Sequence, residues 1–436
     1  MNSHPSETIF YKQRQLAENN LIVAVISGDL SIFFQGFARS ISLITHRADF
    51  SMSTLPCYFD YAATTPVDDR VIQAMVTCLG REGTFGNPAS NSHAYGNQAR
   101  QAVELARRQV AELVGTDADA LVWTSGATES NNLAIKGIAL GASGTRRHLI
   151  TSRIEHKAVI DTVRQLELAG YQVTWLEPDS QGLIQPAAVR QALRDDTLLV
   201  SLMLVNNELG TLTDIATIGQ LIREHGALFH VDAAQGAGKV AIDLNALAVD
   251  LMSFSAHKTY GPKGIGALYV GERARGQLEA QMHGGGHEQG FRSGTLATHQ
   301  IVGMGAAYAL ACAEMHEEVQ RIGHLSALLR DGLLQLPGVS LNGDPHQRVP
   351  HTLNICVDSP GFNALTLSAD LAVSSTSACN SASNGASHVL LALGLTPSKA
   401  GSSLRLSLGR YTEMSDVERA ISVIAGRLNS PSTPFW

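Results

Sequence analysis

The stretch SFSAHKTYGPKGIGALYV at residues 253–270 decides how this chain is interpreted, because it places a polar loop between two apolar runs. The apolar runs, 251–256 and 265–270, are short and are expected to form strands. Lys258 lies in the loop directly after the first strand, beside His257 and several hydroxyl side chains. A lysine held there could form a Schiff base with a carbonyl cofactor, and desolvation would lower its pKa. Taken by itself, Lys258 is better explained as a lysine of a surface loop.

The segments on the N-terminal side of this stretch alternate between apolar strands and helices. Expected strands lie at 121–125, 148–152, 171–176, 197–205 and 227–232, and expected helices at 97–115, 128–139, 155–170, 186–193 and 214–226. With the two apolar runs around Lys258, this makes seven strands. Nearly continuous apolar strands joined by helices predict an α/β fold, in which helices cover both faces of a mostly parallel sheet. After about residue 300, a long helical run at 300–335 leads to a smaller α+β unit that ends in a helix at 415–428.

The composition excludes several classes of protein. Hydrophobic residues make up 44% of the 436 residues and charged residues 16%, which is typical of a globular protein. The 32 Lys and Arg against 39 Asp and Glu give a net charge of −7, which argues against direct nucleic-acid binding. The five cysteines contain no C-x-x-C pair, so a disulfide framework or zinc ribbon is not expected. This cysteine usage favours a reducing compartment.

The first fifty residues differ from the rest. Their most apolar stretch, 21–44, is interrupted by Asp29 and Arg39 and is too broken for a membrane span of about 20 apolar residues. Acidic residues near the start count against a secretory or mitochondrial leader. We therefore expect no membrane association, an extension at 1–51 outside the fold, and the cytoplasm rather than the mitochondrial matrix.

Two further motifs gain meaning beside Lys258. SGATES at 125–130 is a glycine-containing turn between a strand and a helix, and free N–H groups at a helix N-terminus bind phosphate. An ordinary helix start with Thr128 as its cap would explain the same motif. HVDAAQ at 230–235 puts Asp232 at the C-terminal end of a strand, where open α/β sheets bind ligands. That carboxylate could pair with a protonated ring nitrogen, or it could only cap the next turn.

The order of these three signals is more specific than any one of them. A phosphate turn, a strand-end aspartate and a lysine 26 residues later match the needs of a pyridoxal 5'-phosphate (PLP) site. Such a protein must hold the phosphate, pair the pyridine nitrogen and bind the aldehyde.

The chain here resembles the class V aminotransferases, which have fold type I of the PLP-dependent transferases, and within them the cysteine desulfurases of the NifS/IscS type. Besides the three motifs above, the resemblance rests on YFDYAATTP (58–66), GNPASNSHAYG (86–96), EHKAV (155–159), VNNELG (205–210), GGGHEQGFRSGT (284–295), SSTSACNSAS (374–383) and RLSLGRYT (405–412). It implies a large PLP-binding domain at 68–316. It also implies a small α+β domain, formed by 52–67 and 317–436, that carries the active-site cysteine loop.

The resemblance also implies a role for each matching residue. In this family the lysine, here Lys258, binds the cofactor covalently, and the aspartate, here Asp232, pairs with the ring nitrogen. Gln235 matches the residue that bonds the ring hydroxyl, and His156 matches the residue that stacks on the ring. Asn207 falls near the ring and the substrate. The contacts to the phosphate fall on Ala127, Thr128, Ser255 and His257, and on Thr295 from the other subunit of a homodimer. His156 is in addition a candidate acid or base. Asn207 and Arg405 are expected to bind the substrate, Arg405 by gripping its carboxylate.

Cys379 is the residue that separates the desulfurases from other members of the fold. It lies in a run of small polar residues that suits a mobile loop. The family's nucleophilic cysteine falls here, although Asn380 stands where the family often has threonine. Cys78, Cys312 and Cys356 lie in apolar segments and are expected in the core.

The implied reaction removes sulfur from L-cysteine. Lys258 would take the Cα proton, and the Cys379 thiolate would attack the substrate sulfur, leaving alanine and a persulfide on Cys379. The persulfide would pass to an acceptor protein for iron–sulfur cluster assembly, tRNA thiolation or related transfer. Selenocysteine lyase and a non-catalytic PLP-binding scaffold for sulfur transfer are the alternatives.

We predict no intrinsic metal site. His283 and His287 flank three glycines, which disfavours a helical pair of ligands, and the H-E-x-x-H order is absent. Cys379 could serve only as a transient ligand of an iron–sulfur cluster. The charged face of the helix at 97–115 is expected to be solvated.

Overall fold

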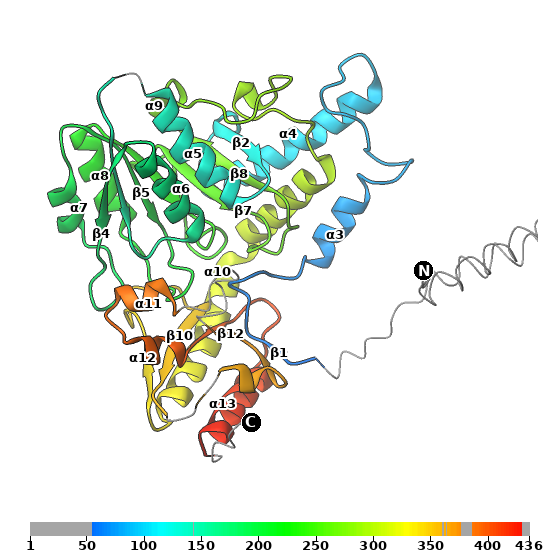
Figure 1. The fold of residues 1–436 in the computed structure, drawn as a ribbon. Coiled ribbons are helices and arrows are strands. Elements are labelled where there is room, and N and C mark those ends of the chain that lie inside the picture. Colours follow the sequence, from blue (N-terminus) through cyan, green and yellow to red (C-terminus); the bar gives the residue numbers. More distant parts are fainter. Residues whose placement is uncertain (1–54, 143, 360–361, 363, 376–385, 430–436) are drawn as a thin grey trace, which may run out of the picture. The chain divides into compact units, whose positions relative to one another are not determined.

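A seven-stranded sheet organises the larger part of the structure (Figure 1). This computed structural model describes residues 55–142, 144–359, 362, 364–375 and 386–429. The extension predicted at 1–51 and the segment that contains Cys379 lie outside these residues. The strands follow the spatial order β2, β8, β7, β6, β5, β3, β4, with bounds β2 Leu121–Thr124, β3 His148–Ser152, β4 Gln172–Leu176, β5 Thr197–Met203, β6 Leu228–Asp232, β7 Leu251–Ser255 and β8 Gly266–Val270.

Four of the six pairings in this sheet are parallel, and only β8 runs antiparallel to its neighbours β2 and β7. The predicted mostly parallel sheet of seven strands is therefore confirmed. The helices that accompany it are α3 Asp69–Val76, α4 Ala94–Val114, α5 Ala127–Gly141, α6 Lys157–Leu168, α7 Pro186–Ala192, α8 Ile215–His225 and α9 Glu272–Arg275, with 3-10 turns at Ala118–Ala120 and Glu288–Gly290.

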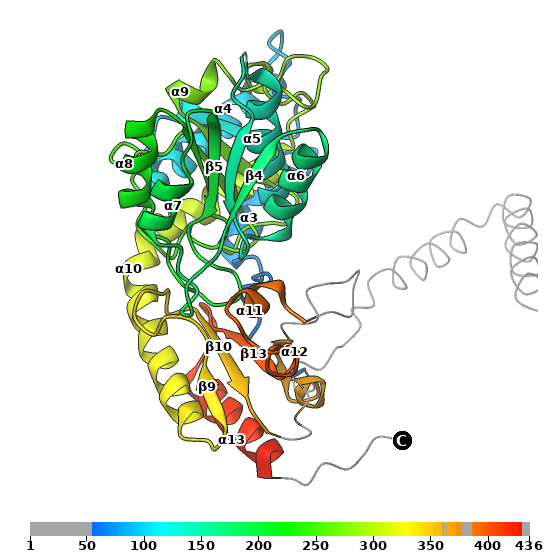
Figure 2. The same ribbon diagram turned by 60° about the vertical axis from the view of Figure 1, so that its left-hand side comes forward.

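Each face of the sheet has its own core, because successive side chains of a strand point to opposite faces. On β2, Trp123 packs in the core that α4, α7, α8 and the N-terminal part of the long helix α10 (Thr298–Leu334) cover. Its neighbour Val122 packs in the core that α5, α6 and α9 cover. Figure 2 shows the sheet between these helices. The predicted coverage of both faces is thus observed.

A second, four-stranded antiparallel sheet lies beside the C-terminal half of α10 (Figure 2). Its order is β12, β13, β10, β9, with bounds β9 Val339–Leu341, β10 Thr352–Val357, β12 Ser374–Ser375 and β13 Ser403–Ser407. The helices of this region are α11 His388–Ala392, α12 Pro397–Gly401 and α13 Met414–Asn429, with a 3-10 turn at Ala364–Leu367. Strand β1 (Cys57–Tyr58) pairs with β11 (Leu371–Ala372) and brings the segment before α3 into this smaller α+β region. The exact boundaries proposed for the two domains stay a prediction.

Two expectations about the surface were wrong. Cys312 is exposed, because the apolar sequence around it forms part of α10 and this position faces away from the core. Arg107 on α4 was expected on a solvated face but is only 7% exposed. Its guanidinium pairs with Glu288 at 2.8 Å and contacts the indole of Trp123. Cys78 and Cys356 are buried as predicted.

Within the described part of the chain, every helix is too short or too polar to cross a bilayer.

Candidate active site

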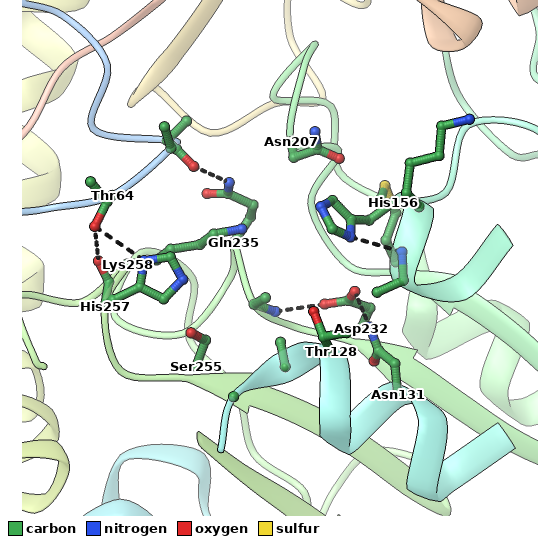
Figure 3. Close-up of a pocket in the computed structure, with 18 of the residues that line it drawn as sticks. Thr64, Thr128, Asn131, His156, Asn207, Asp232, Gln235, Ser255, His257 and Lys258 are labelled. Carbon is green, nitrogen blue, oxygen red and sulfur yellow. Dashed lines mark hydrogen bonds between the residues drawn. The ribbon is translucent and has the colours of Figure 1, made fainter. Parts of the chain in front are cut away.

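One cavity of about 530 Å³ opens at the C-terminal ends of β5, β6 and β7, where the N-terminus of α5 also points (Figure 3). In an open α/β sheet, the loops that follow the parallel strands lie at this edge, where ligands bind. Ten of the residues singled out from the sequence line the cavity: Ala127, Thr128, His156, Asn207, Asp232, Gln235, Ser255, His257, Lys258 and Arg405. Thr295 is exposed and does not line it. Cys379 belongs to a segment outside the described residues.

Asp232 ends β6 and is held at both oxygens of its carboxylate. Oδ1 accepts a hydrogen bond from the backbone N–H of Ala234 at 2.9 Å, so the residue does cap the next turn. Oδ2 accepts a hydrogen bond from Nδ2 of Asn131 at 2.7 Å. The carboxylate is only 6% exposed yet lines the cavity, which suits it to pair with a cation there.

The N-terminus of α5 forms a pole suited to an anion. Its N-cap is Gly126, and no side chain caps the helix, so the alternative in which Thr128 is a simple cap is wrong. The N–H groups of the first turn therefore have no intrahelical partner and face the cavity with the positive end of the helix dipole. Oγ of Ser255, from the end of β7, is buried beside them and has no hydrogen-bond partner among the described residues.

His257 and the loop after Lys258 are held by the segment before α3. Nδ1 of His257 lies 3.1 Å from Oγ1 of Thr64, and burial lowers the pKa of His257 to about 4. Three residues after His257, Tyr260 has a φ of 58°, which is uncommon for a bulky side chain. This conformation is fixed because its N–H donates to Oγ1 of Thr65 and its carbonyl accepts from the N–H of Asp68. The loop that presents Lys258 to the cavity is thus rigidly anchored.

His156 is the N-cap of α6 and its ring faces the cavity (Figure 3). Its Nδ1 accepts the N–H of Ala158 at 3.1 Å, so the neutral ring carries its proton on Nε2. Burial, followed by the positive charge of Lys258, lowers the pKa of His156, which keeps the ring neutral near pH 7. A neutral ring can lie flat against an aromatic cofactor and donate a hydrogen bond through its Nε2–H.

A second histidine of the cavity, His388, had not been identified from the sequence. It begins α11, and its Nε2 lies 3.0 Å from the carbonyl oxygen of Glu155, to which it donates. Next to it, Ser387 donates to the buried carboxylate of Glu208. Both bonds join the start of α11 to the cavity wall. The sequence offered little signal, because a histidine beside a serine-rich run is typical of many surface loops.

Arg405 lies on β13 and reaches the cavity from the smaller α+β region. Its Nη1 donates to the carbonyl of Asn207 at 2.9 Å, and its Nη2 donates to Asp60 at 2.8 Å and to Ser374 at 2.9 Å. Nε of Arg405 and Oδ1 of Asn207 are buried and have no partner among the described residues. One donor and one acceptor therefore remain for a further ligand.

The chemistry of this cavity fits PLP. Buried polar atoms nearly always have partners in folded proteins. Four buried polar atoms that line this cavity have none among the described residues, which indicates a ligand site: Oδ1 of Asn131, Oδ1 of Asn207, Oγ of Ser255 and Nε of Arg405. The anion pole suits the phosphate, Asp232 suits a protonated pyridine nitrogen, and Lys258 suits an aldehyde. A serine hydroxyl, two amide oxygens and a guanidinium N–H could each gain a partner from the cofactor or from an amino-acid substrate.

Comparison with known proteins also indicates a PLP-dependent enzyme. The model of the class V aminotransferase family matches residues 57–420, and the chain belongs to this family. The cysteine desulfurase IscS of Azotobacter vinelandii is 58% identical over 386 residues, which cover 88% of this chain and 95% of the relative. The IscS of Pseudomonas aeruginosa is 57% identical over 389 residues with the same coverage.

Two solved structures show the same fold. A NifS-like protein superposes with a TM-score of 0.78 at 34% identity and covers 85% of this chain and 99% of its own. A structure described as SspA in complex with cysteine gives a TM-score of 0.73 at 39% identity, with 82% and 99% covered. The predicted resemblance, fold class and PLP cofactor are confirmed by these matches.

Proposed function

We propose that this chain is a PLP-dependent cysteine desulfurase, which converts L-cysteine to L-alanine and carries the released sulfur as a persulfide on Cys379. The observation that carries the proposal is the convergence of Lys258, Asp232 and the anion pole of α5 on one cavity with unpartnered polar atoms. The relatives named as cysteine desulfurases support the same activity.

The residues around the cofactor would each hold one part of it. The N–H groups of α5, with Thr128, Ser255 and His257, bind the phosphate, and His156 lies against the ring. Asp232, oriented by Asn131, keeps the proton on the ring nitrogen. When bound, PLP supplies an electron sink for negative charge that develops at the Cα of the substrate.

The proton and sulfur transfers then fall to side chains of this protein. Arg405 grips the substrate carboxylate, Asn207 lies near the ring and the substrate, and the amine of Lys258 removes the Cα proton. The Cys379 thiolate attacks the substrate sulfur, so that an S–S bond forms while the Cβ–S bond breaks. The electron pair of that broken bond stays with the carbon skeleton, which becomes alanine after protonation. Lys258 carries the proton that it took from Cα and can return it for this step, and His156 can donate a hydrogen bond to the reacting group through its Nε2–H.

The assembly and location follow from the same proposal. Thr295 is exposed outside the cavity of its own chain, which suits a residue that contacts the phosphate in the second subunit of a homodimer. An acceptor protein would take the sulfur from Cys379 in the cytoplasm. The small domain, 52–67 with 317–436, would carry the cysteine loop to it, and the large domain, 68–316, would hold PLP.

Turnover by the purified full-length chain, loaded with PLP, tests this function. In two parallel reactions, the enzyme is given either L-cysteine or L-selenocysteine together with a reductant, and the alanine formed is quantified. We expect alanine from L-cysteine with sulfide in equal amount. Alanine from L-selenocysteine alone would favour a selenocysteine lyase, and alanine from neither, with PLP retained, would favour the non-catalytic scaffold.

A further inference from the structure

A lysine behind the cofactor cavity has no role in the mechanism above. Lys239 follows Gln235 by four residues in the helical turns after β6, and its Nζ donates to Oε1 of Gln235 at 3.0 Å. It lines a second, small cavity of about 10 Å³ together with Lys258, Glu318 and His351. Its surroundings are an unusual place for an ammonium group: burial, and then the positive charge of Lys258, lower the pKa of Lys239 to about 7.

The hydrogen bonds of Gln235 allow its amide only one orientation. The carbonyl oxygen of Ala62 can only accept, and Nζ of Lys239 donates to Oε1 in either protonation state. Oε1 must therefore face Lys239, and Nε2 must face the carbonyl of Ala62, to which it donates at 2.7 Å. Gln235 is 5% exposed and lines the active cavity, where Figure 3 shows its side chain between Thr64 and His156. Its amide nitrogen keeps a second N–H that neither partner uses.

We propose that Lys239 is a positioning residue for cofactor binding, which acts by locking the amide of Gln235 so that its remaining N–H is presented to the ring hydroxyl of PLP. This inference rests on the proposed function and adds a residue behind the residues that line the cavity. Without Lys239, Oε1 loses its donor and only the bond from Nε2 to the carbonyl of Ala62 holds the amide, which can then turn more easily. An oxygen would then face the ring oxygen for part of the time, which repels instead of binding.

The role of Lys239 can be separated from ordinary packing by a double-mutant cycle. The full-length variants Lys239→Met, Gln235→Ala and the double variant are dialysed to equilibrium against graded concentrations of PLP, and the bound cofactor is measured by its absorption. We expect each single variant to bind PLP about tenfold more weakly than the wild type. In the Gln235→Ala background, Lys239→Met should change the affinity by less than about twofold, because the amide through which it acts is gone.

The absorption spectrum of bound PLP supplies a second readout that does not depend on turnover. Since loss of an N–H at the ring hydroxyl alters the same chromophore in both cases, Lys239→Met and Gln235→Ala should shift the visible maximum in the same direction. Lys239→Arg keeps a donor and should bind PLP within about threefold of the wild type. Lys136→Met, which removes a lysine of α5 outside the cavity, serves as the control for loss of one positive charge.

Additive losses in the cycle, or wild-type affinity and spectrum in Lys239→Met, would overturn the inference. A lower melting temperature with unchanged affinity would show a structural role only and would also overturn it. If Lys239→Met does not fold, Lys239→Gln, whose shorter side chain cannot reach Oε1 in the same way, takes its place with the same expected outcome. Failure of the wild type to make alanine from L-cysteine would instead reject the proposed function.

Discussion

Nδ2 of Asn131 donates to Oδ2 of Asp232 at 2.7 Å, which joins the second turn of α5 to the end of β6. The first turn of the same helix forms the anion pole of the cavity. One helix therefore positions two parts of the cofactor site, the phosphate pole directly and the ring-pairing carboxylate through a hydrogen bond. Oδ1 of Asn131 is buried without a partner in the described residues, so the amide is held only through its nitrogen.

Replacing Asn131 by alanine should lower kcat for alanine production by about tenfold, because Asp232 loses one of its two oriented bonds. The neighbouring Asn132→Ala is the matched control, since Nδ2 of Asn132 donates to the carbonyl of Thr128 on the outer side of the helix. Steady-state kinetics of both variants measures the effect. Equal kcat values for Asn131→Ala and the wild type would contradict the positioning role.

Ser255 and Ser253 lie two residues apart on β7 and should respond in opposite ways to replacement by alanine. Oγ of Ser255 has no partner among the described residues, whereas Oγ of Ser253 is bonded to Nε2 of His230 at 2.9 Å. Ser255→Ala should bind PLP about tenfold more weakly and leave the stability of the cofactor-free protein unchanged. Ser253→Ala should lose about 1 kcal/mol of unfolding free energy and keep its PLP affinity. Equilibrium dialysis and urea unfolding separate the two, and reversed results would reject the phosphate assignment.

Glu155 gives the fold a pH dependence of known sign. Burial raises the pKa of Glu155 to about 8 from an unperturbed 4.5, although Ser152 donates to its Oε1 at 2.6 Å. Between these two pH values the folded chain keeps a proton that the unfolded chain has lost, so this residue's contribution to stability is full below pH 4.5 and decreases as the pH rises to 8.

Glu155→Gln is neutral at every pH and should remove this dependence. The variant should be more stable than the wild type by about 4 kcal/mol at pH 8, with little difference near pH 4.5. Urea unfolding of the cofactor-free proteins at several pH values measures it. Glu224→Gln, on the exposed side of α8, removes one carboxylate in the same way and serves as the matched control. A constant difference between Glu155→Gln and the wild type across this range would contradict the assignment.

The sequence was sufficient to predict the seven-stranded sheet and the residues that converge on its C-terminal edge. The carboxyl ends of parallel strands meet at one edge of a sheet, so the sequence alone was enough to predict that Asp232 and Lys258 lie close together. Asn131 and His388 were not identified from the sequence, because their contacts are with segments far away along the chain and no local sequence pattern indicates them. Lys239 was not identified for a different reason: a lysine in a turn is usually solvated, whereas the fold buries this one beside Gln235 and Lys258.

The errors have a similar physical cause. Helical periodicity shows which residues share a face, but a neighbouring segment decides whether that face is covered. Glu288, 181 residues further along the chain, pairs with Arg107 and covers it. At Cys312 no segment of the described structure covers the helix face to the same degree, and the thiol stays exposed.

The most direct test of the central claim is the fate of the sulfur on Cys379. Wild type, Cys379→Ala and Cys312→Ala are each loaded with PLP and given L-cysteine without a reductant. Peptides are then examined by mass spectrometry for one added sulfur atom, and alanine is quantified with a reductant present. We predict a persulfide on Cys379 in the wild type and in Cys312→Ala, and alanine production lowered by about 10²-fold or more in Cys379→Ala. Wild-type alanine production by Cys379→Ala, with no added sulfur on Cys379 in the wild type, would contradict the account.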